Sequence, residues 1–502
     1  MSSLKEVVIS RASAKQRAGR AGRVKPGHCW RLYSAEFLAS DLVDDQPAPE
    51  IKRVPLEEVV LQVLLLKLGL PEQFLSKCLE PPSMGQVKAS VNCLLEIKAI
   101  LPKPSLPLTA LGYHLAQMPV DVRVGKMLIN ASLLNCIEPA LTIAAALSGK
   151  SPFTTPPNLR EEATRAHKTF ISTHNTAMAT EQYFAPTKSS GALSQHLTPF
   201  NDAFFSDHLA CVSAFNLWYR ILQEHGEKTA YSFCRDKYLS HNILTEIMRL
   251  RENFKGHLRS AGFLAPESSS GEFQELDEID DSEYDPSSVT PDTSRFLKLP
   301  IVPAAESRTD LVRCALCAGL STNIVRVSRF EDPTKKAARQ AKDIRRKKED
   351  APLHIMQRDG VEVHVHPSSL THGLLKYLLE GGQGSGQGLR TGRMKDAYIV
   401  YHKKFASGKV LMYDCTAVSP TAVLLFGGDV RISSVRKSST KSGVVVTIGS
   451  WMHFKMSELH GVLIRRLQWE IESLLRTKVE DPSRDVSKRQ AVLARVVETL
   501  LG

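Results

Sequence analysis

The sequence predicts a multi-domain, mainly α-helical protein with a small β-barrel near its carboxyl end. Its 502 residues are enough for roughly three or four domains, and a hydrophobic content of 42% can fill their cores. Apolar side chains recur at helical spacing through most of residues 51–264. From Val361 onward the period changes to two, and glycine-rich turns separate short runs, which is typical of a small barrel.

The distribution of charge and the number of cysteines indicate what kind of partner the protein binds and in which compartment it occurs. The net charge is +12, and residues 267–292 hold about ten acidic residues but neither Lys nor Arg. The remainder therefore carries about +22, an excess typical of nucleic-acid-binding proteins. Nine cysteines without paired spacing indicate a reducing compartment. No run reaches about 18 apolar residues and no signal pattern begins the chain, so we expect a soluble, intracellular protein with no membrane partner.

The most informative stretch is residues 13–23, where Arg17, Arg20 and Arg23 alternate with small residues. Each glycine weakens a helix by about 1 kcal/mol relative to alanine, so the pattern is unfavourable unless it serves a site. The small residues between the arginines add little side-chain bulk, so that several guanidinium groups can converge on one anion. Arginine binds phosphate bidentately and stays protonated. The pattern indicates a phosphate site; the alternative is a basic loop on a solvated surface.

This run resembles the sixth conserved motif of the DEAH/RHA branch of superfamily-two RNA helicases. The resemblance implies an ATP-dependent RNA helicase in which arginine fingers contact the γ-phosphate and a glutamine positions the attacking water. The residues implied as catalytic are Arg20, Arg23 and Gln16, and those implied to hold the nucleotide are Arg17, Gly19 and Gly22. ATP and Mg²⁺ are the cofactors implied for the complete enzyme.

Two motifs that such an enzyme requires are absent from the sequence. It contains no G-x-x-x-x-G-K-S/T phosphate loop and no Asp-Glu-x-His magnesium motif, and the glycine-rich residues 381–388 have no lysine after them. We therefore expect this chain to be the carboxy-terminal piece of a larger helicase and to be inactive alone. The alternative is a non-enzymatic RNA- or ribosome-binding module.

The first half of the chain is predicted to hold three parts. A Pro-Gly turn and alternating residues predict a last RecA-like strand at 24–33. Helical spacing at 56–66 and 87–99, followed by a short unit at 108–116, favours a winged-helix domain, which the resemblance also places here. Residues 111–264 resemble the ratchet-like helical domain of the family, with a loop insertion near 185–199.

Within the family, the likeness is nearest to the ribosome-associated DExH helicase of translation initiation. It implies RNA as a partner, the small ribosomal subunit as a further one, and a location in the cytoplasm, with the nucleus as the alternative.

The second half begins with two charged segments. Residues 265–295 have the composition of an acidic, disordered linker. Residues 335–348 form the densest basic run, either a solvated tether or an RNA contact. Between them, residues 311–320 predict an apolar helix, in which Cys314 and Cys317 are expected to be core residues and not metal ligands.

The His-Pro-Ser-Ser sequence and residues 418–428 resemble the OB-fold signature of the family. The strand at 398–404 combines aromatic rings with cations, and from it we predict RNA-binding residues Tyr401, Lys403 and Lys404. His364 and His366 alternate with valines and are expected to be structural, so no metal site is predicted. An amphipathic helix at 459–477 and a frayed tail helix complete the chain.

The predicted domains are the remnant of a second RecA-like domain at 1–50, a winged-helix domain at 51–110, a ratchet-like helical domain at 111–264, an acidic linker at 265–295, a helix with a basic insert at 296–350, an OB-fold-like domain at 351–480 and a tail helix at 481–502.

Overall fold

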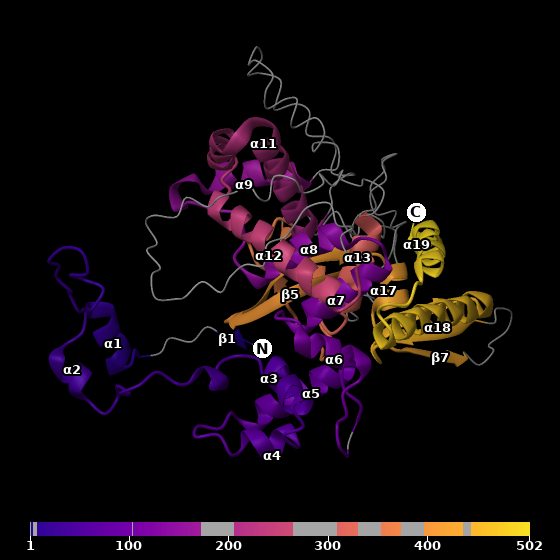
Figure 1. Ribbon diagram of the computed structural model, residues 1–502, viewed down its shortest axis with the longest axis horizontal. Helices are drawn as coiled ribbons and strands as arrows, with labels where there is room; N and C mark the ends of the chain where they lie inside the picture. The colour runs from indigo at the N-terminus through magenta and orange to yellow at the C-terminus, as the bar shows by residue number, and fades with distance from the viewer. Residues whose placement is uncertain are drawn as a thin grey trace, which may run out of the picture. The chain divides into compact units, whose positions relative to one another are not determined.

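A computed structural model describes residues 2–3, 8–102, 104–171, 205–264, 309–329, 353–372, 396–434 and 443–501 (Figure 1). The chain forms two compact units, one of residues 1–117 with 404–411 and one of residues 118–403 with 412–502. The predictions for the loop insertion, the acidic linker, the basic run and the glycine-rich segment fall outside the described residues.

The first unit is built from short helices. They are α1 (Arg11–Ala18), α2 (Ala35–Ala39), α3 (Glu57–Leu65), α4 (Pro71–Leu75), α5 (Met84–Glu96) and α6 (Ala110–Gln117), with a 3-10 turn at Glu50–Lys52. A capping box fixes the start of α5, because the Ser83 hydroxyl accepts from the Gln86 amide while the Gln86 side chain accepts from the Ser83 amide. The predicted helices at 56–66 and 87–99 are confirmed, with ends shifted by a few residues, and most of the short unit predicted at 108–116 is the helix α6.

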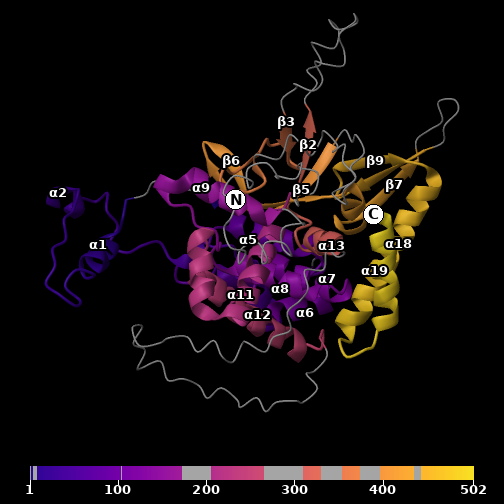
Figure 2. The same cartoon turned by 90° about the horizontal axis from the view of Figure 1, so that it is seen from above.

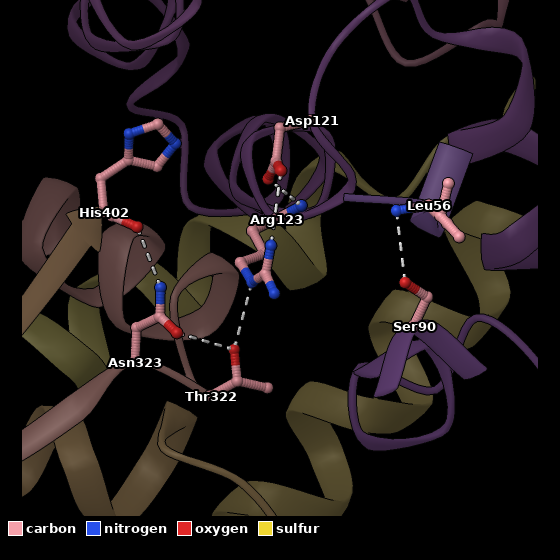
Figure 3. Close-up of polar contacts among 7 residues, drawn as sticks. All are labelled: Leu56, Ser90, Asp121, Arg123, Thr322, Asn323 and His402. Atoms are coloured by element: carbon pink, nitrogen blue, oxygen red, sulfur yellow. Dashed lines mark hydrogen bonds and ion pairs between the residues drawn. The ribbon is translucent and has the colours of Figure 1, made fainter. Parts of the chain in front are cut away.

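Apolar packing of α3 against α5 and α6 forms the core of this unit. Two polar contacts fix the register: the Leu56 amide donates to the Ser90 hydroxyl at 3.3 Å (Figure 3), and Gln62 Nε2 donates to the Ala116 carbonyl at 2.6 Å. Among the described residues of 51–117, β pairing is limited to the bridge between Ile100 and Leu108.

The strand predicted at 24–33 is wrong. These residues have no regular secondary structure, and the side chains of Val24, Trp30 and Leu32 are 93%, 87% and 100% exposed. A strand needs a neighbouring strand to accept its backbone hydrogen bonds. In the described part of the chain, residues 24–33 pair with none, so their alternating pattern does not produce one.

Helices also dominate the first part of the second unit. They are α7 (Val122–Leu133), α8 (Ile137–Ser148), α9 (Arg160–Lys168), α11 (Asp207–Asp236), α12 (His241–Ser260) and α13 (Thr309–Gly319), with 3-10 turns at Pro157–Leu159 and Thr169–Ile171. Helix α8 packs against α7, α11 and α12 (Figure 2). The buried guanidinium of Arg251 on α12 joins these helices. It donates hydrogen bonds to Glu138 at 2.8 Å and to Thr142 at 2.5 Å, both on α8, and it lies 4.6 Å from the ring centre of Phe215 on α11.

The larger sheet has the strand order β3-β2-β5-β6-β4. Its strands are β2 (Ile324–Arg329), β3 (Leu353–Met356), β4 (His364–Val365), β5 (Asp396–Ser407) and β6 (Lys409–Val418), and the two-residue β1 (Ser2–Ser3) pairs in parallel with the end of β5. The segment before β4 turns back to β3, since the Val363 amide donates to the Ile355 carbonyl at 2.9 Å. The two edges are thereby joined into a partly closed barrel. Strand β2 belongs to this barrel although it precedes the predicted boundary at 351.

Three helices and a second sheet complete the unit. The antiparallel strands β7 (Val430–Ser434), β8 (Val444–Ile448) and β9 (Met452–Met456) lie beside α17 (Pro420–Phe426), α18 (Glu458–Glu480) and α19 (Ser487–Leu501) (Figure 1). Helix α18 packs on β8 through Gly461, where an added Cβ would approach Val444 to 2.6 Å. The predicted helix at 459–477 is confirmed. The tail is helical but not frayed, because Val497 is fully buried. No helix in the described ranges is long and apolar enough to cross a membrane.

Candidate functional site

The arginine-rich motif follows a short, well-capped helix. The hydroxyl of Ser10 accepts from the Ser13 amide at 3.1 Å and begins α1, and the helix ends at Gly19. The chain then turns at Gly22, whose φ of +86° lies in the left-handed region that favours glycine. The two predicted glycines therefore have separate roles: one ends the helix and the other redirects the loop.

Arg11 fixes the loop in place. Its side chain donates to the Leu38 carbonyl at 2.9 Å, to the Ser40 carbonyl at 2.9 Å and to the Asp45 carboxylate at 2.6 Å. Its amide also donates to the Asp44 carbonyl at 2.9 Å. Sequence reasoning missed Arg11, because its partners lie about thirty residues away and no local pattern marks them. The Arg11 side chain anchors α1 through these hydrogen bonds, and Arg17, Arg20 and Arg23 are left exposed to solvent.

The motif side chains form a solvent-exposed cationic surface. Gln16, Arg17, Arg20 and Arg23 are all exposed, and residues 8–35 contain seven Lys or Arg but neither Asp nor Glu. Three permanently charged guanidinium groups, one at the end of α1 and two in the loop after it, have no Asp or Glu nearby in the sequence to neutralise them, and they fit a polyanion such as a nucleoside triphosphate. In the described ranges, no three His, Cys, Asp or Glu side chains are arranged to hold a metal ion.

A first polar chain in the second unit joins the start of α7 to the barrel (Figure 3). Asp121 caps α7 by accepting from the Arg123 amide at 2.9 Å, and it pairs with the Arg123 guanidinium at 3.4 Å. Arg123 Nε donates to the Thr322 hydroxyl at 3.4 Å, Thr322 contacts Asn323 at 3.4 Å, and Asn323 Nδ2 donates to the His402 carbonyl at 3.2 Å. These bonds connect a helix terminus to β5 across a long stretch of sequence.

A second polar chain joins the start of α11 to the same barrel. The Asp207 carboxylate accepts from the Ser369 hydroxyl at 2.6 Å, the Cys415 amide at 2.9 Å and the Thr371 amide at 3.3 Å. Burial raises the pKa of Asp207 to about 6, although these donors favour the ionised form. The carboxylate is thus the common acceptor for β6 and the turn after β4. Neither the donors nor Asp207 were predicted.

His208, the next residue, extends this chain. Its Nδ1 lies 2.6 Å from the Thr416 hydroxyl, which is 2.7 Å from the Ser206 hydroxyl, and Ser206 Oγ accepts from the Leu209 amide at 3.0 Å. Burial lowers the pKa of His208 to about 4, outweighing the nearby Asp414 carboxylate that favours protonation. The ring is therefore neutral and has a structural role.

Because the His208 ring is neutral in the folded chain, we expect the free energy of unfolding to depend on pH. Because its pKa is lowered below the unfolded value of 6.5, its stabilising contribution is present above that value and is lost as the pH falls toward 4. From pH 7 to pH 5, the free energy of unfolding of the native chain should fall by about 2 kcal/mol relative to that of His208→Asn, which cannot titrate. Asp207 is present in both proteins, so its opposite pH dependence cancels. Urea unfolding at the two pH values measures the difference, and an unchanged difference contradicts this role.

The predicted RNA-binding residues of β5 do not lie together on one open surface. Lys403 is exposed and Lys404 is partly buried, but the Tyr401 ring is only 3% exposed. Its hydroxyl accepts from Gln357 Nε2 at 2.8 Å inside the barrel. Residues 397–401 are buried on both faces of the strand, so Tyr401 has no free ring face for a base, and its predicted stacking role is corrected.

The other histidines and cysteines singled out in the sequence have structural surroundings. The rings of His366 and Tyr413 stack with centres 4.2 Å apart, and His366 Nδ1 lies 2.6 Å from the Ser368 hydroxyl. Cys314 and Cys317 are fully buried in α13, as predicted.

Three family models match separate parts of the chain. Residues 121–211 match a helicase associated domain (HA2), ratchet-like, and residues 312–430 match an oligonucleotide/oligosaccharide-binding (OB) fold. Residues 444–502 match a C-terminal domain in RNA helicases. The first match covers α7 to the start of α11, and the second begins in α13 and covers the barrel. The predicted ratchet-like and OB-fold domains are thereby confirmed.

Curated relatives match nearly the whole chain. It is 30% identical to the ATP-dependent DNA/RNA helicase DHX36 of Mus musculus over 97% of the chain and 39% of the relative. It is 30% identical to the ATP-dependent RNA helicase dhx29 of Xenopus laevis over 100% of the chain and 30% of the relative. The DExH-box ATP-dependent RNA helicase DExH4, chloroplastic, of Arabidopsis thaliana is 31% identical over 100% of the chain and 30% of its own length. The chain therefore spans less than half of each relative, and what it shares with these DExH-type RNA helicases is a helicase-associated domain, an OB fold and a C-terminal domain found in RNA helicases.

Proposed function

We propose that this chain supplies the nucleotide-sensing arginines and part of the RNA-binding surface of an ATP-dependent RNA helicase. The observation that carries the proposal is the arginine loop after α1. The loop is anchored by Arg11, residues 8–35 contain neither Asp nor Glu, and the side chains of Arg17 at the end of α1 and of Arg20 and Arg23 in the loop are all exposed. Among the described residues, none of these three side chains takes part in a hydrogen bond or ion pair, and their charge matches what a developing phosphoryl charge requires.

In the proposed mechanism, residues of this chain bind the phosphates of ATP and stabilise their negative charge. The guanidinium groups of Arg20 and Arg23 contact the γ-phosphate and stabilise the negative charge that grows on it. Gln16 orients the attacking water, and Arg17 supports the loop whose bends Gly19 and Gly22 allow. Bound Mg²⁺ would neutralise phosphate charge, and its ligands would come from motifs that this sequence lacks.

We further propose that residues 1–50 end a RecA-like domain and that residues 51–110 form a winged-helix domain. The helices α3, α5 and α6 with the bridge at Ile100 and Leu108 support the second assignment, because they follow the order helix, helix and short β contact. The two polar chains that begin at Asp121 and Asp207 bind the ratchet-like helices to the barrel. They would let these parts respond to RNA as one body.

The RNA contact on β5 rests on its two lysines. Replacing Lys403 and Lys404 together by Gln should flatten the slope of log affinity against log salt for single-stranded RNA by about one unit, because each neutralised phosphate contributes about −0.7. Fluorescence anisotropy at several salt concentrations measures the slope. The control Lys228→Gln/Arg235→Gln removes two exposed charges from α11 and should leave it unchanged. Equal slopes in all three proteins would exclude β5 from the RNA path.

The second candidate function is a non-enzymatic RNA- or ribosome-binding module. It is favoured by the missing phosphate-loop and magnesium motifs in this sequence. A cytoplasmic location, with the nucleus as the alternative, and the small ribosomal subunit as a partner belong to both candidates. ATP hydrolysis by the protein in which this chain occurs separates them, since a binding module has none.

A further inference from the structure

The antiparallel sheet β7–β9 comes from a stretch of sequence whose charges have one sign. Residues 430–457 contain five Lys or Arg and nine Ser or Thr, but neither Asp nor Glu. Asp429 and Glu458 stand at the two ends of this stretch, and counting both still leaves an excess of three positive charges. Of the five cations, Arg431 on β7 and Lys455 on β9 lie in the described part of the sheet. The three strands therefore carry a positive charge that no carboxylate within them neutralises.

The two faces of this sheet differ in polarity. Val444, Val446 and Ile448 of β8 are buried on the inner face, where Gly461 of α18 lies against Val444. Figure 2 shows α18 lying along the β7–β9 sheet. The side chains at the alternate positions of the three strands are on the other face and are exposed or half-buried. We call them the outer sheet face: Arg431, Ser433, Val445, Thr447, His453 and Lys455.

The outer sheet face is arranged in two rows that run across the strands. The first row consists of Arg431, Thr447 and His453, and the second of Ser433, Val445 and Lys455. In the first row, the Thr447 hydroxyl lies 3.0 Å from His453 Nδ1. Strands about 4.8 Å apart and rows about 7 Å apart place Arg431 and Lys455 roughly 12 Å from each other, at opposite edges of the sheet. One phosphate group cannot contact both cations, but successive phosphates of a polymer can.

The β7–β9 sheet is fixed beside the barrel. Arg358, in the turn after β3, donates to the Ser450 hydroxyl in the turn between β8 and β9 at 3.2 Å. The rings of Tyr398 on β5 and Phe454 on β9 have their centres 5.5 Å apart. The barrel and the sheet are therefore held together, and one RNA strand can bind to this part of the chain at more than one point.

The composition of the outer sheet face selects its partner. Proteins hold nucleic-acid phosphates mainly with cationic side chains and hydroxyl groups, which make up most of this face. Protein partners gain most of their binding energy from large apolar or aromatic anchors, and no exposed large hydrophobic residue lies on the described β7, β8 and β9. The face also has no Phe, Tyr or Trp on which a base could stack. We propose that the outer sheet face binds the sugar–phosphate backbone of single-stranded RNA without reading its bases; this rests on the RNA binding proposed above and adds a contact separate from that on β5.

The test measures how the affinity for RNA depends on salt. Arg431→Gln/Lys455→Gln in the full chain should flatten the slope of log affinity against log salt by about 1.4 units, because two phosphates each contribute about 0.7. Fluorescence anisotropy with labelled oligouridylate and oligocytidylate should give the same change, since no base is read. The matched control Arg465→Gln/Arg476→Gln removes two exposed charges from α18, which covers the inner face, and should leave the slope unchanged. All four altered side chains are exposed, so thermal midpoints should stay close to that of the native chain.

Combined variants separate this contact from the one on β5. Arg431→Gln/Lys455→Gln added to Lys403→Gln/Lys404→Gln should flatten the slope further than either pair alone. A native slope in Arg431→Gln/Lys455→Gln, with a flatter slope in Lys403→Gln/Lys404→Gln, would overturn the proposal and leave the RNA contact on β5 in place. Failure of the native chain to bind either RNA would overturn both. Binding of a labelled oligoglutamate peptide that Arg431→Gln/Lys455→Gln abolishes, with the affinity for RNA unchanged, would assign the outer sheet face to an acidic protein segment and also overturn the proposal.

Discussion

Arg20→Ala and Arg23→Ala should each lower RNA-stimulated ATP turnover by about 10³-fold or more in a protein that joins this chain to a complete ATP site. The reason is that an arginine finger stabilises charge that develops mainly in the transition state, so its loss acts on turnover more than on binding. ATP affinity should therefore fall much less. Steady-state hydrolysis and nucleotide binding, measured on the same preparations, separate the two effects.

Two further variants make this result specific to the motif. Arg20→Lys keeps the charge but loses the bidentate fork, so it should also be strongly impaired. Arg31→Ala removes an exposed arginine from the irregular segment after the motif and should be nearly normal. Normal turnover in both Arg20→Ala and Arg23→Ala would show that the roles assigned to these arginines are wrong.

Gly319→Ala should destabilise the second unit by about 1–3 kcal/mol, as overpacking a tight contact does. Helix α13 approaches α7 so closely at this glycine that an added Cβ would lie 2.6 Å from the Met127 Cβ and 2.7 Å from the Arg123 carbonyl oxygen. Backbone atoms cannot rotate away, so the helices must separate. Arg123 lies at this contact, and its hydrogen bond to Thr322 begins the polar chain that joins α7 to the barrel. We therefore expect the affinity for RNA to fall together with the free energy of unfolding.

Gly256→Ala on α12 is the matched control for this prediction. An added Cβ there meets nothing within 4 Å, so alanine should be neutral or stabilise the helix by up to about 1 kcal/mol. Thermal unfolding of both variants gives the comparison. Equal midpoints would mean that the α7–α13 contact relaxes without loss.

Local sequence patterns predicted the helices well. Helices α3, α5 and α18 have apolar residues at a period close to 3.6 and bury that face, whereas the apolar helix α13 is buried on all sides. The carboxy-terminal tail was expected to fray. Tertiary packing of Val497 decides otherwise, and sequence periodicity alone does not contain that information.

The polar chains could not be predicted, because their partners are far apart in sequence. Asp207 and Ser369 are separated by 162 positions, and Arg123 and Thr322 by 199. The stacking role predicted for Tyr401 was wrong for a related reason. The combination of aromatic rings and cations on β5 suggested an RNA-binding surface, but the strand is central in a partly closed barrel, and residues 397–401 are covered on both sides. The arginine motif could be singled out from sequence because its residues are contained in eight consecutive positions, and the roles assigned to them stay predictions.

The central claim is that this chain senses ATP and contacts RNA only as part of a larger motor. Its most direct test compares ATP hydrolysis by the chain alone with hydrolysis by the same chain joined to a domain that carries the phosphate-loop and Asp-Glu-x-His motifs, both over a range of single-stranded RNA concentrations. The account predicts no turnover above blank for the chain alone and turnover that rises to saturation with RNA for the joined protein. The account would be contradicted by RNA-stimulated hydrolysis by the chain alone, or by turnover of the joined protein that does not change with RNA concentration.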